Sequence, residues 1–294
     1  MKPPVFEYDA PATVEEALSL LSEHVDDVKV LAGGQSLVPL LNFRLARPAR
    51  LVDINGLGEL AYIRRRDGQL RIGALTRYAA LERSDMVACG WPVLSDALEV
   101  LAHPQIRNRG TVGGSVAHAD PAAELPVAFA ALDATFRARS VRGERTIGWG
   151  DFFVTHLTSV LEPDELLTEI VVPALPERTG GAFVEFAQRH GDFALGGACA
   201  LASIDVSGRC TKAAISLLAA APTPLRSGEA EAALVGGPID EDTVARAAEL
   251  AVRDIEPTGD IHGSSDYRRT LIQALVRRAL TTAADRAVSA GGPA

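Results

Sequence analysis

The 294-residue sequence holds only three cysteines, and this scarcity excludes several kinds of site. Cys89, Cys199 and Cys210 lie far apart and form no CxxC pair. An iron–sulfur cluster takes four thiolates, and a zinc site usually shows close ligand spacing. The six histidines are scattered and form no HExxH or HxH motif. We therefore expect no metal site in this chain.

Long apolar runs and a surplus of positive charge are also missing. No stretch approaches the length of a membrane span, and the N-terminal MKPPVFEYDAPAT has no apolar signal-peptide core. We therefore expect a cytoplasmic protein without a membrane span. The net charge of −9 argues against a nucleic-acid-binding protein, because such proteins need cations to neutralise phosphates.

The order of predicted elements favours an α+β protein with three consecutive regions. Residues 1–57 contain a β-α-β unit, in which strand DVKVL, helix SLVPLLNFRLA and strand ARLVDIN follow one another. Residues 58–176 open with a hairpin that turns at Asp67-Gly68 and continue with helices and strands. Residues 177–294 contain three consecutive strands, expected to form an antiparallel sheet, followed by helices.

The middle region contains a long connection. Residues 102–121, AHPQIRNRGTVGGSVAHADP, are predicted to be a loop. Asp120 is expected to cap the helix that follows, with Pro121 at its first position.

Two double-glycine motifs stand out, AGGQS at 32–36 and TVGGS at 111–115. Glycine lets a backbone approach a ligand closely because no Cβ intervenes, and successive N–H groups bind anions. Two such loops that converge on one ligand would suit a diphosphate flanked by sugars. Tight turns explain both motifs equally well from spacing alone.

Two other motifs are rejected. GLGELA at 56–61 matches the dinucleotide-binding string, but that fingerprint requires a helix directly after it, and YIRRRDGQLRI indicates a hairpin. GQSLV around Ser36 is no nucleophile elbow, because Val38 stands where the final glycine belongs.

An ordered series of motifs extends over essentially the whole chain. The two double glycines are accompanied by LVDI (51–54), IGALT (72–76), HPQIRNRG leading into TVGGS, DPAAELP, EPDELLTEIVVP and RHGDFALGGACA. In this order the chain resembles the FAD-binding medium subunit of the xanthine dehydrogenase and carbon monoxide dehydrogenase family. The resemblance implies a two-subdomain FAD-binding fold (PCMH/vanillyl-alcohol-oxidase-like), followed by a C-terminal antiparallel three-stranded sheet with helices.

The resemblance also implies a set of FAD contacts. The two glycine loops are expected to wrap the diphosphate and ribityl region between the first two subdomains. Glu124 stands where an aspartate commonly meets the adenosine ribose. The cofactor-binding residues implied are Leu31, Ala32, Gly33, Gly34, Gln35, Ser36, Leu37, Leu101, Thr111, Val112, Gly113, Gly114, Ser115, Glu124, Leu167 and Phe193.

Several of these residues have a purely structural alternative. Glu124 suits the first turn of a helix through the helix dipole, and core packing explains Leu101, Leu167 or Phe193. Glu185 stands where some family members carry a lysine near the flavin, so that lysine contact is not expected here. Arg107, Arg109 and Arg189 are expected to be solvated surface charges.

The function implied by the resemblance is electron transfer. Partner chains would hold the other redox groups, a molybdenum cofactor on a large subunit and 2Fe-2S clusters on an iron–sulfur small subunit. FAD on this chain would pass electrons to an external acceptor, within a dimer of heterotrimers. No side chain is expected to be catalytic, because the flavin carries the chemistry. A free-standing FAD-dependent oxidase or dehydrogenase and a non-catalytic nucleotide-binding assembly module are the alternatives.

Overall fold

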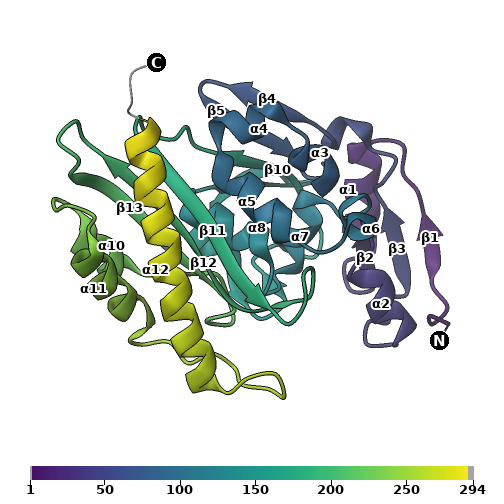
Figure 1. Ribbon diagram of the computed structural model, residues 1–294. Helices are drawn as coiled ribbons and strands as arrows, with labels where there is room; N and C mark the ends of the chain where they lie inside the picture. Colours follow the sequence, from purple (N-terminus) through teal and green to yellow (C-terminus); the bar gives the residue numbers. More distant parts are fainter. Residues whose placement is uncertain (1, 291–294) are drawn as a thin grey trace.

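A computed structural model of the protein describes residues 2–290, and its main β-sheets follow one another along the molecule (Figure 1). The first sheet lies near the N-terminus, and the last lies beneath the long C-terminal helix. The core of the first sheet is continuous with Leu60, Leu75 and Leu166 of the middle region. The core of the middle region extends onto the inner face of the last sheet.

The first sheet is parallel, with the order β1-β3-β2. Its elements are β1 (Glu7–Asp9), α1 (Val14–Glu23), β2 (Val28–Leu31), α2 (Leu37–Asn42) and β3 (Arg50–Asp53). The parallel pairing of β2 with β3 confirms the β-α-β unit. Helix α2 is shorter than predicted, because the chain turns at Arg44, whose φ of 59° is left-handed.

The middle sheet has the order β4-β5-β10-β6-β7, and its neighbouring strands are antiparallel. Asp67 and Gly68 both have positive φ, which confirms the predicted hairpin turn. The strands and short helix of this sheet are η1 (Gly58–Leu60), β4 (Ile63–Arg66), β5 (Gln69–Gly73), β6 (Thr135–Ser140), β7 (Gly143–Gly148) and β10 (Leu166–Val172). The other elements are α3 (Tyr78–Glu82), α4 (Asp85–Gly90), α5 (Pro92–Val100), α6 (Pro104–Arg107), α7 (Val112–His118), α8 (Glu124–Ala131), α9 (Trp149–Phe152), β8 (Phe153–Thr155) and β9 (Thr158–Ser159).

The prediction of a loop over residues 102–121 is wrong, because this segment contains α6 and α7. Thr111 caps α7 by accepting a hydrogen bond from the Gly114 amide at 3.2 Å. Packing of buried Val112 and Val116 outweighs the low helix propensity of the glycines.

The predicted cap of α8 is also wrong. Helix α8 begins at Glu124 after Ala123, and the Asp120 carboxylate instead accepts from the Ala122 amide at 2.9 Å. Asp120 therefore makes a turn that precedes the helix.

The last sheet is antiparallel, with the order β11-β12-β13-β14. The three predicted strands pair in sequence, and the two-residue β14 joins their edge. All of β12 is buried, since α12 covers one face and the middle region the other (Figure 1). A Cβ at Gly180 would overlap the backbone of Ala283, so α12 lies very close to β11. The elements are β11 (Thr179–Ala187), β12 (Ala194–Ile204), β13 (Cys210–Leu218), β14 (Leu225–Arg226), α10 (Gly228–Leu234), α11 (Glu241–Val252) and α12 (Ser265–Ala290).

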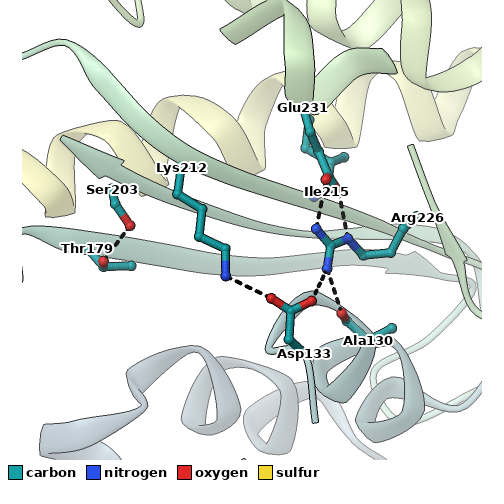
Figure 2. A network of polar contacts seen from close by, with 8 residues as sticks. All are labelled: Ala130, Asp133, Thr179, Ser203, Lys212, Ile215, Arg226 and Glu231. Carbon is teal, nitrogen blue, oxygen red and sulfur yellow. Dashed lines mark hydrogen bonds and ion pairs between the residues drawn. The ribbon is translucent and has the colours of Figure 1, made fainter. Parts of the chain in front are cut away.

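Polar contacts join the last sheet to the end of α8 (Figure 2). Asp133 accepts from Lys212 at 2.8 Å and from Arg226 at 2.5 Å. Arg226 also donates to the Ala130 carbonyl at 3.2 Å and to the Glu231 carboxylate at 2.6 Å. These ion pairs, of which Arg226 is the half-buried member, join the last sheet to the helix whose first turn carries Glu124.

Candidate functional site

The two double-glycine motifs lie side by side. The first motif connects β2 to α2, and the second begins α7. A Cβ at Gly33 would lie 2.6 Å from the Arg109 carbonyl oxygen and 2.8 Å from the Gly110 Cα. Gly33 therefore permits backbone-to-backbone contact between the loops. Gly34 has a φ of 72°, a conformation that glycine adopts without strain.

A cavity of about 350 Å³ lies at the first loop. The carboxyl ends of β2 and β3 meet there, as the open edge of a parallel sheet favours for ligand sites. This volume falls within the range of small-molecule pockets. The cavity is lined by Leu31, Ala32, Gly33, Gly34, Gln35, Val38, Pro39, Asp53, Asn55 and Arg109.

The rest of the predicted loop residues occupy helix starts. Ser36 precedes α2 without a side-chain cap, and Leu37 is its first residue. Gly113 packs on Ala74, whose Cβ would lie 2.5 Å from a Cβ added to the glycine. Val112 is fully buried. The second motif thus supplies structure next to the cavity, and the residue that lines it, Arg109, precedes the motif.

The charges beside the cavity favour an anionic ligand. Burial would raise the pKa of Asp53, but hydrogen bonds from Tyr8 and Asn55 and the charge of Arg109 lower it overall. Burial lowers the pKa of Arg77, and the nearby Arg109 cation lowers it further. The Arg77 and Arg109 guanidinium groups therefore lie close together at this edge, and Arg109 is the one that lines the cavity.

Glu124 follows the second motif in the sequence and is the first residue of α8. Burial raises the pKa of Glu124 to about 7, and that of Glu185 on β11 to about 8, where the charge of Glu124 adds to the effect. The Oε2 atom of Glu185 is buried and has no hydrogen-bond partner. Tyr78 is hydrogen-bonded to Ser115, and burial followed by the charge of Glu124 raises its pKa to about 12. This acidic cluster is separate from the residues that line the cavity.

The three predicted apolar cofactor residues away from the glycine motifs, Leu101, Leu167 and Phe193, do not lie together in one environment. Leu101 and Leu167 are buried in the core of the middle region. Phe193 is 74% exposed between β11 and β12, so its interpretation as core is wrong. Its loop packs on α6, since a Cβ at Gly191 would lie 2.5 Å from the ring of His103.

Arg107 differs from the predicted solvated charge. Its side chain is 12% exposed and pairs with Glu82 at 3.1 Å. It also donates to the carbonyls of Leu101 and Ala102, both at 2.9 Å. Arg107 therefore supports the turn before α6, while Arg109 and Arg189 are exposed as predicted.

Sequence reasoning missed Asp53, Asn55 and Arg109 as lining residues. The signal for the first two was present, because Asp53 ends the strand LVD beside the glycine loop and Asn55 follows two residues later. Arg109 carried no comparable local signal, since its position depends on the contact with Gly33.

Comparisons with known proteins agree over the whole chain. Residues 4–175 match the family described as "FAD binding domain in molybdopterin dehydrogenase", and residues 181–283 match the "CO dehydrogenase flavoprotein C-terminal domain". The 6-hydroxypseudooxynicotine dehydrogenase complex subunit alpha of Paenarthrobacter nicotinovorans is 49% identical, covering 98% of this chain and 97% of that protein. Caffeine dehydrogenase subunit beta of Pseudomonas sp. (strain CBB1) is 40% identical, covering 98% of each.

Solved structures share the same fold. Carbon monoxide dehydrogenase from Hydrogenophaga pseudoflava superposes with a TM-score of 0.95 at 39% identity, over 97% of this chain and 99% of that chain. Quinoline 2-oxidoreductase from Pseudomonas putida 86 gives a TM-score of 0.93 at 41% identity, over 98% and 99%.

Fold, glycine loops and comparisons together define a flavoprotein subunit of an oxidoreductase. The chain belongs to the family of FAD-binding medium subunits of the molybdenum hydroxylases. The predicted family, fold class and FAD cofactor are thereby confirmed. Within residues 2–290, no helix is long and apolar enough to cross a membrane.

Proposed function

We propose that this chain is the electron-transfer subunit of a molybdenum hydroxylase, working in the cytoplasm. Electrons would arrive from 2Fe-2S clusters on a small subunit, after substrate oxidation at a molybdenum cofactor on a large subunit. The three chains would assemble as a dimer of heterotrimers. An external acceptor would then take the electrons. When bound, FAD would supply the change from one-electron to two-electron chemistry at its isoalloxazine ring, because the clusters deliver electrons one at a time.

The observation that carries the proposal is the cavity between the first glycine loop and Arg109. Gly34 and the backbone of the first loop leave room for a diphosphate, and Arg109 adds a compensating charge. We propose that the same residues hold FAD together with the other predicted contacts, including Thr111, Ser115 and Glu124. The protein's own residues bind and orient the cofactor, and none of them transfers a proton in this scheme.

Substrate choice would lie on another chain. The similar proteins are named for carbon monoxide, caffeine and 6-hydroxypseudooxynicotine, although the medium subunits remain alike over nearly their full length. This variation favours one electron-transfer role behind several substrate-oxidising subunits. We further propose that residues 1–57, 58–176 and 177–294 form the three structural units of this subunit, with FAD between the first two.

The test is reconstitution. The purified chain should show a flavin absorption spectrum and be reduced by dithionite, yet should not oxidise any substrate of the hydroxylase class alone. Adding the iron–sulfur and molybdenum subunits should restore turnover, and removing FAD should stop delivery to the acceptor. Substrate oxidation by the isolated chain at the rate of the complex would contradict the proposal, as would a colourless protein that takes up no FAD.

A further inference from the structure

A continuous series of hydrogen bonds connects the two glycine loops. Arg77, which directly precedes α3, donates from Nη1 to the backbone oxygen of Arg109 and from Nη2 to Oδ1 of Asn55 at 2.7 Å. Asn55 in turn donates from Nδ2 to the backbone oxygen of Ala32 at 2.6 Å. The first loop and the segment before α7 are thus joined through two side chains.

The geometry of this connection is tightly determined. Asn55 donates to Asp53 Oδ1 as well as to Ala32, so its amide oxygen faces Arg77. The backbone around Arg77 is fixed by pairing with the second loop, since the Val112 amide donates to Thr76 at 2.9 Å. The half-buried guanidinium then reaches two acceptors in different directions, which suits its planar fork.

This connection lies directly against the cavity. Ala32, Asn55 and Arg109 all line it, and each is held by one of these hydrogen bonds. Gly33 sets the closest approach of the two loops, because its missing Cβ is replaced by the Arg109 carbonyl. The hydrogen bonds of Arg77 keep the two segments from moving apart, since they tie the Arg109 carbonyl to Asn55.

We propose that Arg77 and Asn55 are positioning residues, which together hold the first glycine loop and Arg109 at the separation that binds the diphosphate of FAD. The inference rests on the proposed function of this same site. Arg77 acts through its two acceptors and not as a counter-charge to the phosphates. The two residues therefore work as one unit, and loss of either releases the same loop contact.

The experiment measures FAD dissociation constants of the flavin-free full chain by quenching of flavin fluorescence. Arg77→Lys, Arg77→Met, Asn55→Ala and the double variant Arg77→Met/Asn55→Ala are compared with the wild type. Arg83→Met, at an exposed arginine after α3, is the matched control. Thermal unfolding of each flavin-free protein reports any general loss of folding.

Each single variant should bind FAD about ten- to a hundredfold more weakly, the range for lost hydrogen bonds to charged groups. The double variant should bind FAD about as tightly as the single variant with the lower affinity. The two losses should not add, because the two residues act as one coupled unit. Lysine should fail to restore affinity, because one ammonium cannot reproduce the fork. Arg83→Met should bind like the wild type.

Three outcomes would overturn this inference while leaving the proposed function intact. These are wild-type affinity in Arg77→Met or Asn55→Ala, full rescue by Arg77→Lys, and additive losses in the double variant. An affinity loss matched by a collapse of the flavin-free melting temperature would also overturn it, because the role would then be structural. A wild-type chain that binds no FAD would instead remove the proposed function itself.

Discussion

The two glycine loops share a sequence pattern and differ in almost every physical respect. In the first, Gly34 is left-handed and the loop lines an open cavity. In the second, Gly113 is buried against Ala74, and Gly114 donates to the cap of a helix. The same pair of residues therefore borders a cavity in one place, and in the other it lies within a helix packed against the core. A double glycine leaves space where two Cβ atoms would be, and the surrounding residues determine whether backbone, side chain or a cavity occupies that space.

The largest expected effect on stability comes from a substitution at Gly113 in the second motif. A valine there would place carbon atoms on the Cα, Cβ and carbonyl oxygen of Ala74, which are backbone-linked and unable to move aside. We expect Gly113→Val to destabilise the flavin-free protein by about 3 kcal/mol, the upper range for overpacking. Denaturant unfolding measures this loss. A change below about 1 kcal/mol would show that α7 moves freely away from β5.

The carboxylates beside the two motifs have pKa shifts of opposite sign. Asp53, by the first loop, has a lowered pKa, so its contribution to stability is lost only as pH falls through that low value. Glu124 and Glu185, beyond the second loop, have pKa values of about 7 and about 8, against 4.5 when unfolded. Between these values the folded state holds more protons, so stability falls as pH rises.

Glu185→Gln should therefore flatten this pH dependence. From pH 5 to pH 8 we expect the wild type to lose roughly 2 kcal/mol more than the variant, after allowance for partial solvent access. Chemical unfolding of the flavin-free chain at several pH values gives the two profiles. Glu177→Gln, at an exposed carboxylate, is the control. Parallel wild-type and Glu185→Gln profiles would exclude a buried proton on Glu185.

Gly34 offers a test of backbone conformation with a matched control. Gly34 and Gly68 have φ values of 72° and 77°, and Gly68 lies in the hairpin turn away from the cavity. Alanine at either position should cost about 1–2 kcal/mol of stability through left-handed strain. FAD affinity should fall only in Gly34→Ala. Equal FAD affinity in both variants would remove the first loop from the cofactor site.

The smallest expected effect concerns the cap of α7. Thr111→Val removes the oxygen that accepts from the Gly114 amide and should cost about 1 kcal/mol. Thr111→Ser keeps that oxygen and should remain close to the wild type. Melting temperatures of the flavin-free proteins measure both. A similar loss in the two variants would assign the role of Thr111 to its methyl group and not to its cap.

The sequence predicted features whose causes are local. The β-α-β unit follows from short apolar runs around Gly33 and Gly34, and the hairpin follows from Asp67-Gly68. Helix α7 was missed because glycine disfavours helices in isolation, while contact with distant Ala74 decides its structure. The cavity was only half predicted, because Asp53 and Arg109 reach it from separate segments.

The predictions for the site residues also depend on whether the cause is local or lies in a distant part of the chain. The first-loop residues from Leu31 to Gln35 line a cavity, and FAD contact by any of them stays a prediction. Gly33 in particular permits contact between loops, a role that its sequence neighbours do not reveal. The burial of Arg107 was equally invisible, because its partner Glu82 lies on another helix.

The close contact of α12 with β11 has a consequence for the timing of synthesis. The backbone around Ala283 lies where a side chain at Gly180 would otherwise be, so this face of β11 is covered by α12. Most of the C-terminal region is translated between the two. The N-terminal regions of a growing chain fold first, and here the face of β11 at Gly180 stays uncovered until α12 has emerged from the ribosome. This face of β11 is therefore covered later in synthesis than the loop that lines the cavity, because α12 follows that loop by more than 200 residues.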